Sequence, residues 1–197
     1  MSIDEVKYRL LRYVCLSDEE AKAFLDVLEP FDVSKKDVLV EVNAHCRYFY
    51  WVQEGYLMNF QTDDKGFDHV LQFAIANWWT ADLGSYLHGT LATYRIVALT
   101  DCKLLGISKD NLDNLLDTYP AFERYFRIIF QNALVNHQKR IIQNVAFQAD
   151  VRYDQFNKQF PGIELIVPLK HVASYLGITP QFLSKLRKRS LFNSNPS

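Results

Sequence analysis

The residues best suited to chemistry lie near the C-terminus and are polar or basic side chains at helical spacing. Four of them follow the spacing i, i+3, i+4 and i+7, so one face of a helix would carry them all. The four are Gln181, Ser184, Lys185 and Lys188. Such side chains hydrogen-bond to base edges and pair with phosphates in the major groove of DNA. Residues 168–197 hold five basic residues and no acidic one, so this face predicts double-stranded DNA as a partner.

Two short helices joined by a tight turn must position this face. Pro168 suits the first turn of one helix, where a backbone N–H would have no partner. Gly177 supplies the positive φ of the turn, and Thr179 caps the second helix ahead of Pro180. The pattern predicts a helix-turn-helix whose second helix enters a major groove. The positions expected to be buried are Val172, Ala173, Leu176, Phe182, Leu183 and Leu186.

The charge of the 197-residue chain is divided unevenly along its length. The whole chain has 22 Lys and Arg against 23 Asp and Glu, and its net charge of −1 taken alone argues against a nucleic-acid partner. Residues 1–149 carry a net charge of −5, whereas residues 150–197 carry +4. This division predicts a domain boundary near residue 150 and favours nucleic acid as the partner of the C-terminal part.

The N-terminal part of the chain changes its periodicity after about 30 residues. The first residues follow helical spacing, with a capping box at Ser17 and Glu20 and a stop at Pro30. From Phe31 to Ser108, short β-branched and aromatic runs are separated by turn residues, including a hairpin turn at residues 63–66. Together with the helices, these runs predict an α+β protein with an N-terminal antiparallel β-roll.

A long helical segment follows, since residues 121–160 contain neither Gly nor Pro. It carries two apolar lines on different faces, and two lines need two surfaces to cover them. We expect its own β-roll to cover one line and a second copy of the chain to cover the other. A buried core helix in a monomer would show the same pattern. The first line is Phe126, Phe130, Leu134, Ile141 and Val145, and the second is Ile128, Val135, Ile142 and Ala149. Of the second line, Ile128, Val135 and Ile142 are expected to form the dimer contact.

Motifs spread along the chain match those of one known family. They are Arg152-Tyr153, Phe156, Phe160-Pro161, the segment VPLKHVASYLGITPQFLSKLRK at 167–188 and the run TDCKLLGIS at 100–108. By these motifs the whole chain resembles the Crp/Fnr family of bacterial transcription regulators. The resemblance implies a cyclic-nucleotide-binding-like β-roll domain with N-terminal helices at 1–118, a dimerisation helix at 119–149 and a helix-turn-helix DNA-binding domain at 150–197. The tail SLFNSNPS leads us to expect that a full C-terminal wing hairpin is lacking.

The resemblance also assigns roles within the helix-turn-helix. The family's base-reading positions fall on Gln181 and Lys185, and Gln can pair with adenine while Lys can reach O6 and N7 of guanine. The residues expected to contact phosphates are Thr179, Ser184, Lys188 and His171, although Thr179 as a cap alone and Ser184 as a packing residue alone are structural alternatives. The partners implied are double-stranded DNA, a second copy of the chain in a homodimer, and RNA polymerase.

The effector pocket of the family is only partly present in this sequence. Members that bind cyclic AMP hold the ribose with a Gly-Glu-Leu segment and the phosphate with an Arg-Ser pair, where this chain has Ala81-Asp82-Leu83 and Ala92-Thr93. Without that guanidinium a buried phosphate loses a charge-assisted bidentate contact, and Arg95 is expected on the opposite face of its strand. We expect no response to cyclic AMP by the usual mode. Asp82, Leu83 and Thr93 remain candidates for an unknown small-molecule effector.

Other classes of protein fit the sequence less well. An iron–sulfur sensor of this family needs four cysteine ligands, and the chain has three. A haem sensor would have to use His45, His69 or His88. A cupin-like metal-dependent enzyme, which stays an alternative together with a sensor that has a degenerate pocket, needs three or four convergent ligands. His45-Cys46 is the only adjacent pair of His and Cys. We expect no catalytic residues, metal or cofactor.

Two further features bear on location. The longest apolar runs are too short to cross a membrane, so no membrane partner is expected. The N-terminal residues include two acids and lack the apolar block of a signal peptide. We therefore expect a cytoplasmic protein.

Overall fold

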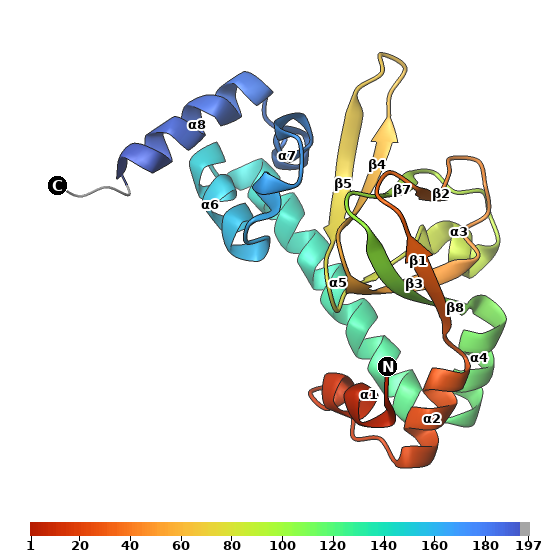
Figure 1. Ribbon diagram of the computed structural model, residues 1–197. Coiled ribbons are helices and arrows are strands. Elements are labelled where there is room, and N and C mark those ends of the chain that lie inside the picture. Colours follow the sequence, from red (N-terminus) through yellow and green to blue (C-terminus); the bar gives the residue numbers. More distant parts are fainter. Residues whose placement is uncertain (194–197) are drawn as a thin grey trace.

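The computed structural model describes residues 1–193, which form a β-roll, a long helix beside it and a helical C-terminal part (Figure 1). The N-terminal helices α1 (Ile3–Leu10) and α2 (Asp18–Asp26) lie near the start of the long helix. Each begins with a capping box, in which a Ser hydroxyl and the Glu side chain three residues later satisfy free backbone N–H groups. The box predicted at Ser17 and Glu20 is confirmed.

The β-roll consists of two four-stranded antiparallel sheets, so this prediction is confirmed. The first sheet has the order β1 (Glu29–Val33), β8 (Cys102–Ser108), β3 (Tyr48–Glu54) and β6 (Trp79–Thr80). The second has the order β2 (Val38–Val40), β7 (Arg95–Ala98), β4 (Leu57–Thr62) and β5 (Asp68–Ala74). A short helix, α3 (Leu83–His88), lies between β6 and β7 in the chain.

The hairpin β4–β5 extends beyond the rest of the roll (Figure 1). Its turn forms because the Asp63 carboxylate accepts hydrogen bonds from the N–H groups of Lys65 and Phe67, each at 2.9 Å, and Gly66 adopts a positive φ of 80°. The hairpin turn predicted at residues 63–66 is confirmed. Strand β5 is the outermost strand of its sheet, so one of its edges has no strand partner.

The long helix α5 (Pro120–Ala146) follows α4 (Lys109–Thr118) and is anchored to the roll by aromatic side chains of its first half. Phe122 stacks on Phe24 of α2 with ring centroids 5.1 Å apart. Tyr125 accepts a hydrogen bond of 2.9 Å from the indole N–H of Trp79, and Phe126 packs against the same ring. These contacts belong to one continuous core that joins the N-terminal helices, the roll and the first half of α5.

The second half of α5 presents its apolar side chains to solvent instead. We expected the roll to cover the whole first apolar line, and it covers only Phe126 and Phe130. Between residues 134 and 145 the apolar side chains of both lines are exposed, and the roll contacts this half of the helix through the polar side chain of Arg140. The exposed apolar residues are Leu134, Val135, Ile141, Ile142 and Val145.

The helical pattern that continues to residue 160 is interrupted at Phe147 and Gln148, both in extended conformation. The next helix, α6 (Ala149–Gln159), buries Tyr153 and Phe156, and the Phe156 ring lies 6.1 Å from that of Phe73 in β5. A straight continuation of α5 would carry these aromatic residues away from the sheet. Their burial explains a break that contains neither Gly nor Pro.

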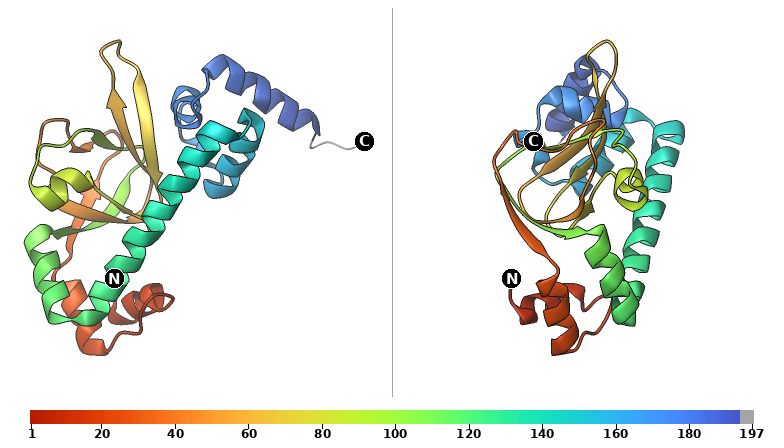
Figure 2. Two further views of the ribbon diagram at one scale, coloured as in Figure 1. Left: turned by 180° about the vertical axis from the view of Figure 1, so that it is seen from behind. Right: turned by 90° about the vertical axis from the view of Figure 1, so that its right-hand side faces the viewer.

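The C-terminal part continues with a 3-10 turn (Ile163–Leu165), α7 (Leu169–Leu176) and α8 (Pro180–Asn193). Helix α7 faces β5, while α8 extends away from the roll (Figures 1 and 2). Up to residue 193 the tail prolongs α8 and forms no wing hairpin. None of the helices within residues 1–193 is long and apolar enough to cross a membrane.

A second hydrophobic core joins the C-terminal helices to the outer face of β4 and β5. Successive residues of β4 point to opposite faces, so Leu57 belongs to the first core while Met58 and Phe60 belong to the second. Thus the C-terminal helices share their core with the roll and do not enclose a separate one. The buried members of this second core are Met58, Phe60, Val70, Phe73, Tyr153, Phe156, Phe160, Ile163, Val167, Val172, Ala173, Leu176, Leu183 and Leu186.

Candidate nucleic-acid interface

The turn between α7 and α8 has the local geometry that its sequence predicts. Gly177 adopts φ +64° and ψ 36°, and the following N–H, that of Ile178, bonds to the carbonyl of Ala173 at 3.0 Å. The hydroxyl of Thr179 accepts a hydrogen bond of 3.2 Å from the N–H of Phe182, so Thr179 is a helix cap. Ala173 is fully buried where the two helices meet. The segment is therefore a helix-turn-helix.

The face of α8 predicted to meet DNA is open to solvent. Gln181, Lys185 and Lys188 are exposed and Ser184 is partly exposed, whereas Leu183 on the other side is fully buried. Because α8 extends away from the roll, nothing in residues 1–193 covers this face (Figure 1). The helix can present donors and positive charge together to a groove.

Two side chains of the helix-turn-helix lie elsewhere than expected. Phe182, expected in the core with Leu183 and Leu186, is 43% exposed because it lies at the border of the buried stripe. His171, expected at a phosphate, is only 8% exposed and lies between α7 and β5, with Nδ1 3.8 Å from Asp68 Oδ2. Burial and the charge of Lys170 lower the pKa of His171, while Asp68 partly opposes this. A buried, neutral imidazole does not reach a DNA phosphate.

The candidate effector residues Asp82 and Thr93 come together and bond to each other. Asp82 is 2% exposed, and one carboxylate oxygen accepts from the N–H of Thr93 at 2.8 Å and from its hydroxyl at 3.0 Å. The other oxygen accepts from the N–H of Ser85 at 3.1 Å and so caps α3, and Leu83 is half-buried beside it. The hydrogen-bond donors of Ser85 and Thr93 are therefore satisfied by a carboxylate of the protein itself.

Arg95 points away from Asp82 and Thr93, as strand alternation predicts, since it lies over the ring of Phe60 on the outer face of β4. Its guanidinium lies 2.6 Å from Glu41 in an ion pair near the surface. The hydrogen bond from Arg95 is the main cause that lowers the pKa of Glu41. Arg95 is thus unavailable as a replacement for the arginine that holds a cyclic phosphate.

The residues considered as metal ligands do not assemble into a site. Within residues 1–193, no three His, Cys, Asp or Glu side chains are grouped closely enough to hold a metal ion. Burial raises the pKa of the Cys46 thiol to about 11, so this cysteine stays protonated near neutral pH. The His45-Cys46 pair therefore gives no support to a metal-dependent enzyme.

The residues expected at a dimer contact lie on the uncovered side of α5. Ile128 is half-buried, while Val135 and Ile142 are 45% and 56% exposed. On the same helix an apolar groove of about 380 Å³ is lined by Phe126, Phe130 and Leu134 together with Leu116 of α4. Exposed apolar side chains grouped on one helix are typical of protein–protein contacts.

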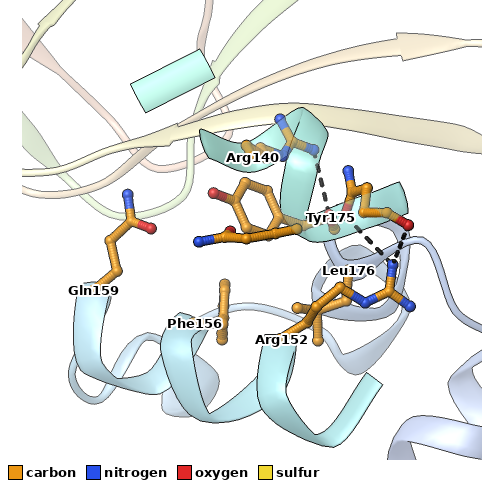
Figure 3. A pocket seen from close by; sticks show the side chains of 8 residues that line it. Arg140, Arg152, Phe156, Gln159, Tyr175 and Leu176 are labelled. Carbon is orange, nitrogen blue, oxygen red and sulfur yellow. Dashed lines mark hydrogen bonds between the residues drawn. The ribbon is translucent and has the colours of Figure 1, made fainter. Parts of the chain in front are cut away.

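Sequence reasoning missed a cluster where α5, α6 and α7 meet (Figure 3). Arg140 lies over the ring of Tyr175 at 4.1 Å, and Arg152 donates to the backbone carbonyl of Asn144 at 3.4 Å. Phe156 and Leu176 line the small crevice between them. Arg152 belongs to a family motif that gave it no role, and Arg140 looks in the sequence like an ordinary solvated charge of a helix, so the local pattern did not bring the two together.

Comparison with known proteins agrees with this geometry. Residues 30–119 match the family described as "Cyclic nucleotide-binding domain". Comparison with curated proteins found no match. Among solved structures, FixK2 from Bradyrhizobium japonicum is similar, with a TM-score of 0.73 at 14% identity over 85% of this chain and 86% of that one.

Two further solved structures are similar over most of their length. The c-di-GMP-responsive global regulator CLP of Xanthomonas campestris has a TM-score of 0.69 at 14% identity, over 90% of this chain and 93% of that one. A protein of Eubacterium rectale assigned to the Crp/Fnr family of transcriptional regulators has a TM-score of 0.69 at 17% identity, over 92% and 88%. At the level of the fold, these comparisons confirm the resemblance noted in the sequence.

Proposed function

Since the chain carries a cyclic nucleotide-binding domain within a Crp/Fnr-type fold, we propose that it is a homodimeric transcription regulator that binds specific DNA sequences. The observation that carries the proposal is the exposed face of α8, with Gln181, Lys185 and Lys188 presented by a helix-turn-helix whose other side is buried. The absence of acidic residues from 168–197 favours the same partner.

On DNA, each side chain of this face has a role that its chemistry allows. Gln181 and Lys185 read base edges from the first turns of α8, while Thr179, Ser184 and Lys188 contact phosphates and set the register. Phe182, exposed beside Lys185, adds an apolar contact suited to a thymine methyl group. As a transcription regulator, the protein has RNA polymerase as its further proposed partner.

Dimerisation through α5 would place the α8 helices of both copies on one side of the DNA. Paired helix-turn-helix units occupy successive major grooves about 34 Å apart. The uncovered apolar residues of α5, including Val135 and Ile142, supply the contact that a two-fold dimer requires. The recognised site is therefore two-fold symmetric, with each half read by one α8.

We also propose that DNA binding does not depend on cyclic AMP. The pocket lacks the arginine that would pair with a cyclic phosphate, and Arg95 is engaged by Glu41. Its hydrogen-bond donors from Ser85 and Thr93 already bind the Asp82 carboxylate. A phosphate entering here would meet this buried negative charge, which Arg95 does not offset because it pairs with Glu41.

Selection from a random duplex library by the purified full-length protein tests the proposal. We expect recovery of symmetric sequences that bind by fluorescence anisotropy much more tightly than scrambled duplexes, with affinity falling steeply between about 50 and 200 mM salt. Addition of cyclic AMP is expected to leave the affinity unchanged. No sequence preference, or binding insensitive to salt, would contradict DNA recognition, and a tighter complex with cyclic AMP would contradict independence from it.

A variant of α8 and a matched control show whether this helix recognises the DNA sequence. The double variant Gln181→Ala/Lys185→Ala should lose about 2–4 kcal/mol of binding free energy for the selected site, with little change for scrambled DNA. The control is Lys22→Ala, which removes a positive charge from an exposed position of α2 at the opposite end of the molecule. Equal losses of binding free energy in the two variants would show that another surface recognises the DNA sequence.

A further inference from the structure

The free edge of β5 is closed by side chains from two other elements. As the outermost strand of its sheet, β5 leaves backbone N–H and C=O groups without a strand partner. Ser174 of α7 satisfies two of them: its hydroxyl accepts from the N–H of Val70 at 2.9 Å and donates to the carbonyl of Asp68 at 2.7 Å. The Ser174 hydroxyl thus makes two hydrogen bonds that a neighbouring strand would otherwise make.

Arg140 of α5 binds the backbone of the same strand. Its guanidinium donates to the carbonyls of Val70, at 2.9 Å, and Leu71, and also to the carbonyl of Tyr175 in α7 at 3.3 Å. The guanidinium also lies over the Tyr175 ring (Figure 3). A single side chain therefore connects the long helix, the roll and the helix-turn-helix.

Apolar and charged contacts surround these hydrogen bonds. The ring of Phe73 in β5 lies 5.3 Å from Tyr175 and 5.8 Å from Phe160. At the rim, Asp68 lies 3.5 Å from the ammonium group of Lys170 and 3.8 Å from His171. The helix-turn-helix is held on the sheet by packing, ion pairing and directed hydrogen bonds together, while the chain joins α5 to α6 only through two extended residues, 147 and 148.

We propose that Arg140 and Ser174 are positioning residues: they fix the orientation of α8 against the roll and thereby set the half-site spacing that the dimer accepts. The inference rests on the proposed function. In a two-fold dimer, the distance between the α8 helices of the two copies depends on where each helix-turn-helix lies on its own protomer. Successive base pairs are about 3.4 Å apart and rotated by about 35°, so a shift and rotation of that size changes the preferred spacing by one base pair. A firmly held helix-turn-helix selects one spacing, and a loosened one accepts several.

Two small substitutions loosen the contact without removing a charge or a large side chain. Arg140→Lys keeps the positive charge but replaces the planar fork by a single ammonium group, which cannot reach three carbonyls in the same directions. Ser174→Ala removes only the hydroxyl that binds the edge of β5. The matched control is Arg127→Lys, since Arg127 is an exposed residue of the same helix and bonds to Gln131 within that helix.

The test measures affinity on duplexes in which the two selected half-sites are moved apart by one or two base pairs. For the wild type and Arg127→Lys we expect a loss of about tenfold per displaced base pair, comparable to the cost of one mismatched pair. For Arg140→Lys and Ser174→Ala we expect a loss of less than about threefold, with unchanged affinity for a single half-site and an unchanged dimer mass in sedimentation. A merely structural role would weaken all duplexes alike.

Spacing profiles identical to the wild type would overturn the inference, and failure of the wild type to select any DNA would overturn the proposed function with it. Hydrogen exchange of the full chain gives a readout without DNA, in case Arg140→Lys fails to fold. Ser174→Ala should accelerate exchange of the Val70 amide at least about tenfold, because that N–H loses its partner. An unchanged Val70 rate would show that α7 is not held on the edge of β5.

Discussion

The buried carboxylate of Asp82 holds the loop between α3 and β7 by accepting three hydrogen bonds. Asp82→Ala would leave the donors of Ser85 and Thr93 without an acceptor, and we expect a loss of about 3 kcal/mol in the free energy of unfolding, measured by urea titration. Because the substitution vacates an anion-sized space lined by donors, acetate should raise the melting temperature of Asp82→Ala and not that of the wild type.

Asp64→Ala is the control for this prediction, since Asp64 is an exposed acid in the β4–β5 turn. Its unfolding free energy should stay within about 0.5 kcal/mol of the wild type. A similarly small effect of Asp82→Ala would show that the three hydrogen bonds do not hold the loop.

His171 makes the stability of the molecule depend on pH. Its pKa is lowered below the usual 6.5, by burial first and by Lys170 second, so the fold favours the neutral imidazole. The unfolded chain takes up a proton more readily, and the contribution of His171 is therefore full above about pH 6.5 and is lost as the pH falls. Wild-type unfolding free energy should fall more between pH 7.5 and 5.5 than that of His171→Gln. The exposed His88→Gln should follow the wild type, and a steeper fall in His171→Gln would contradict the sign.

Residue roles could be predicted where they depend on neighbours in the chain. Gly177 and Thr179 act within a few residues of themselves, so turn and capping chemistry identified them. The position of His171 depends on Asp68, about 100 residues away, and the three-way contact of Arg140 depends on strands and helices that the local pattern does not bring together. Phe182 lies at the border of the buried side of α8, where helical spacing alone does not decide whether a side chain is buried.

Among the elements, α5 divides into a covered half and an uncovered half. A charge at Ile142, which is 56% exposed, leaves the monomer fold intact and opposes contact between two copies. Ile142→Glu should therefore sediment as a monomer at micromolar concentration, with a loss of at least about tenfold in affinity for the two-fold DNA site.

Asn136→Glu is the control for this prediction, because Asn136 is exposed on another face of α5. This variant should remain a dimer. If Ile142→Glu also sediments as a dimer, the contact between copies does not involve this face of the helix.

The elements themselves could largely be predicted, because their signals are local. The capping box at Ser17 and the turn at Asp63 are sequence motifs with direct hydrogen-bond consequences. The break at residues 147–148 had no such signal, since packing of Tyr153 and Phe156 against the sheet causes it. For the same reason the pattern did not show how far the roll covers α5.

At the scale of the whole molecule, the division of charge along the chain corresponds to the arrangement of the elements in space. The net charge of −5 lies on residues 1–149 and that of +4 on residues 150–197, and α8, which carries exposed Lys185 and Lys188, extends away from the roll (Figure 2). An approaching polyanion is thus attracted to one end and repelled from the rest, which orients the encounter before contact. The division of charge could be read from the sequence, whereas the contact between roll and helix-turn-helix required the structure.

The second core bears on whether the C-terminal helices can be exchanged as a module. A fragment of residues 149–197 would expose to water the aromatic faces of Phe156, Phe160 and Tyr175 that Phe73 now covers. We expect this fragment to bind the dye ANS and to melt without a cooperative transition in calorimetry. A sharp transition with little dye binding would show that it folds alone. A chimera that contains this C-terminal segment must therefore also contain the sheet residues that it packs against. These residues are Met58, Phe60, Val70 and Phe73.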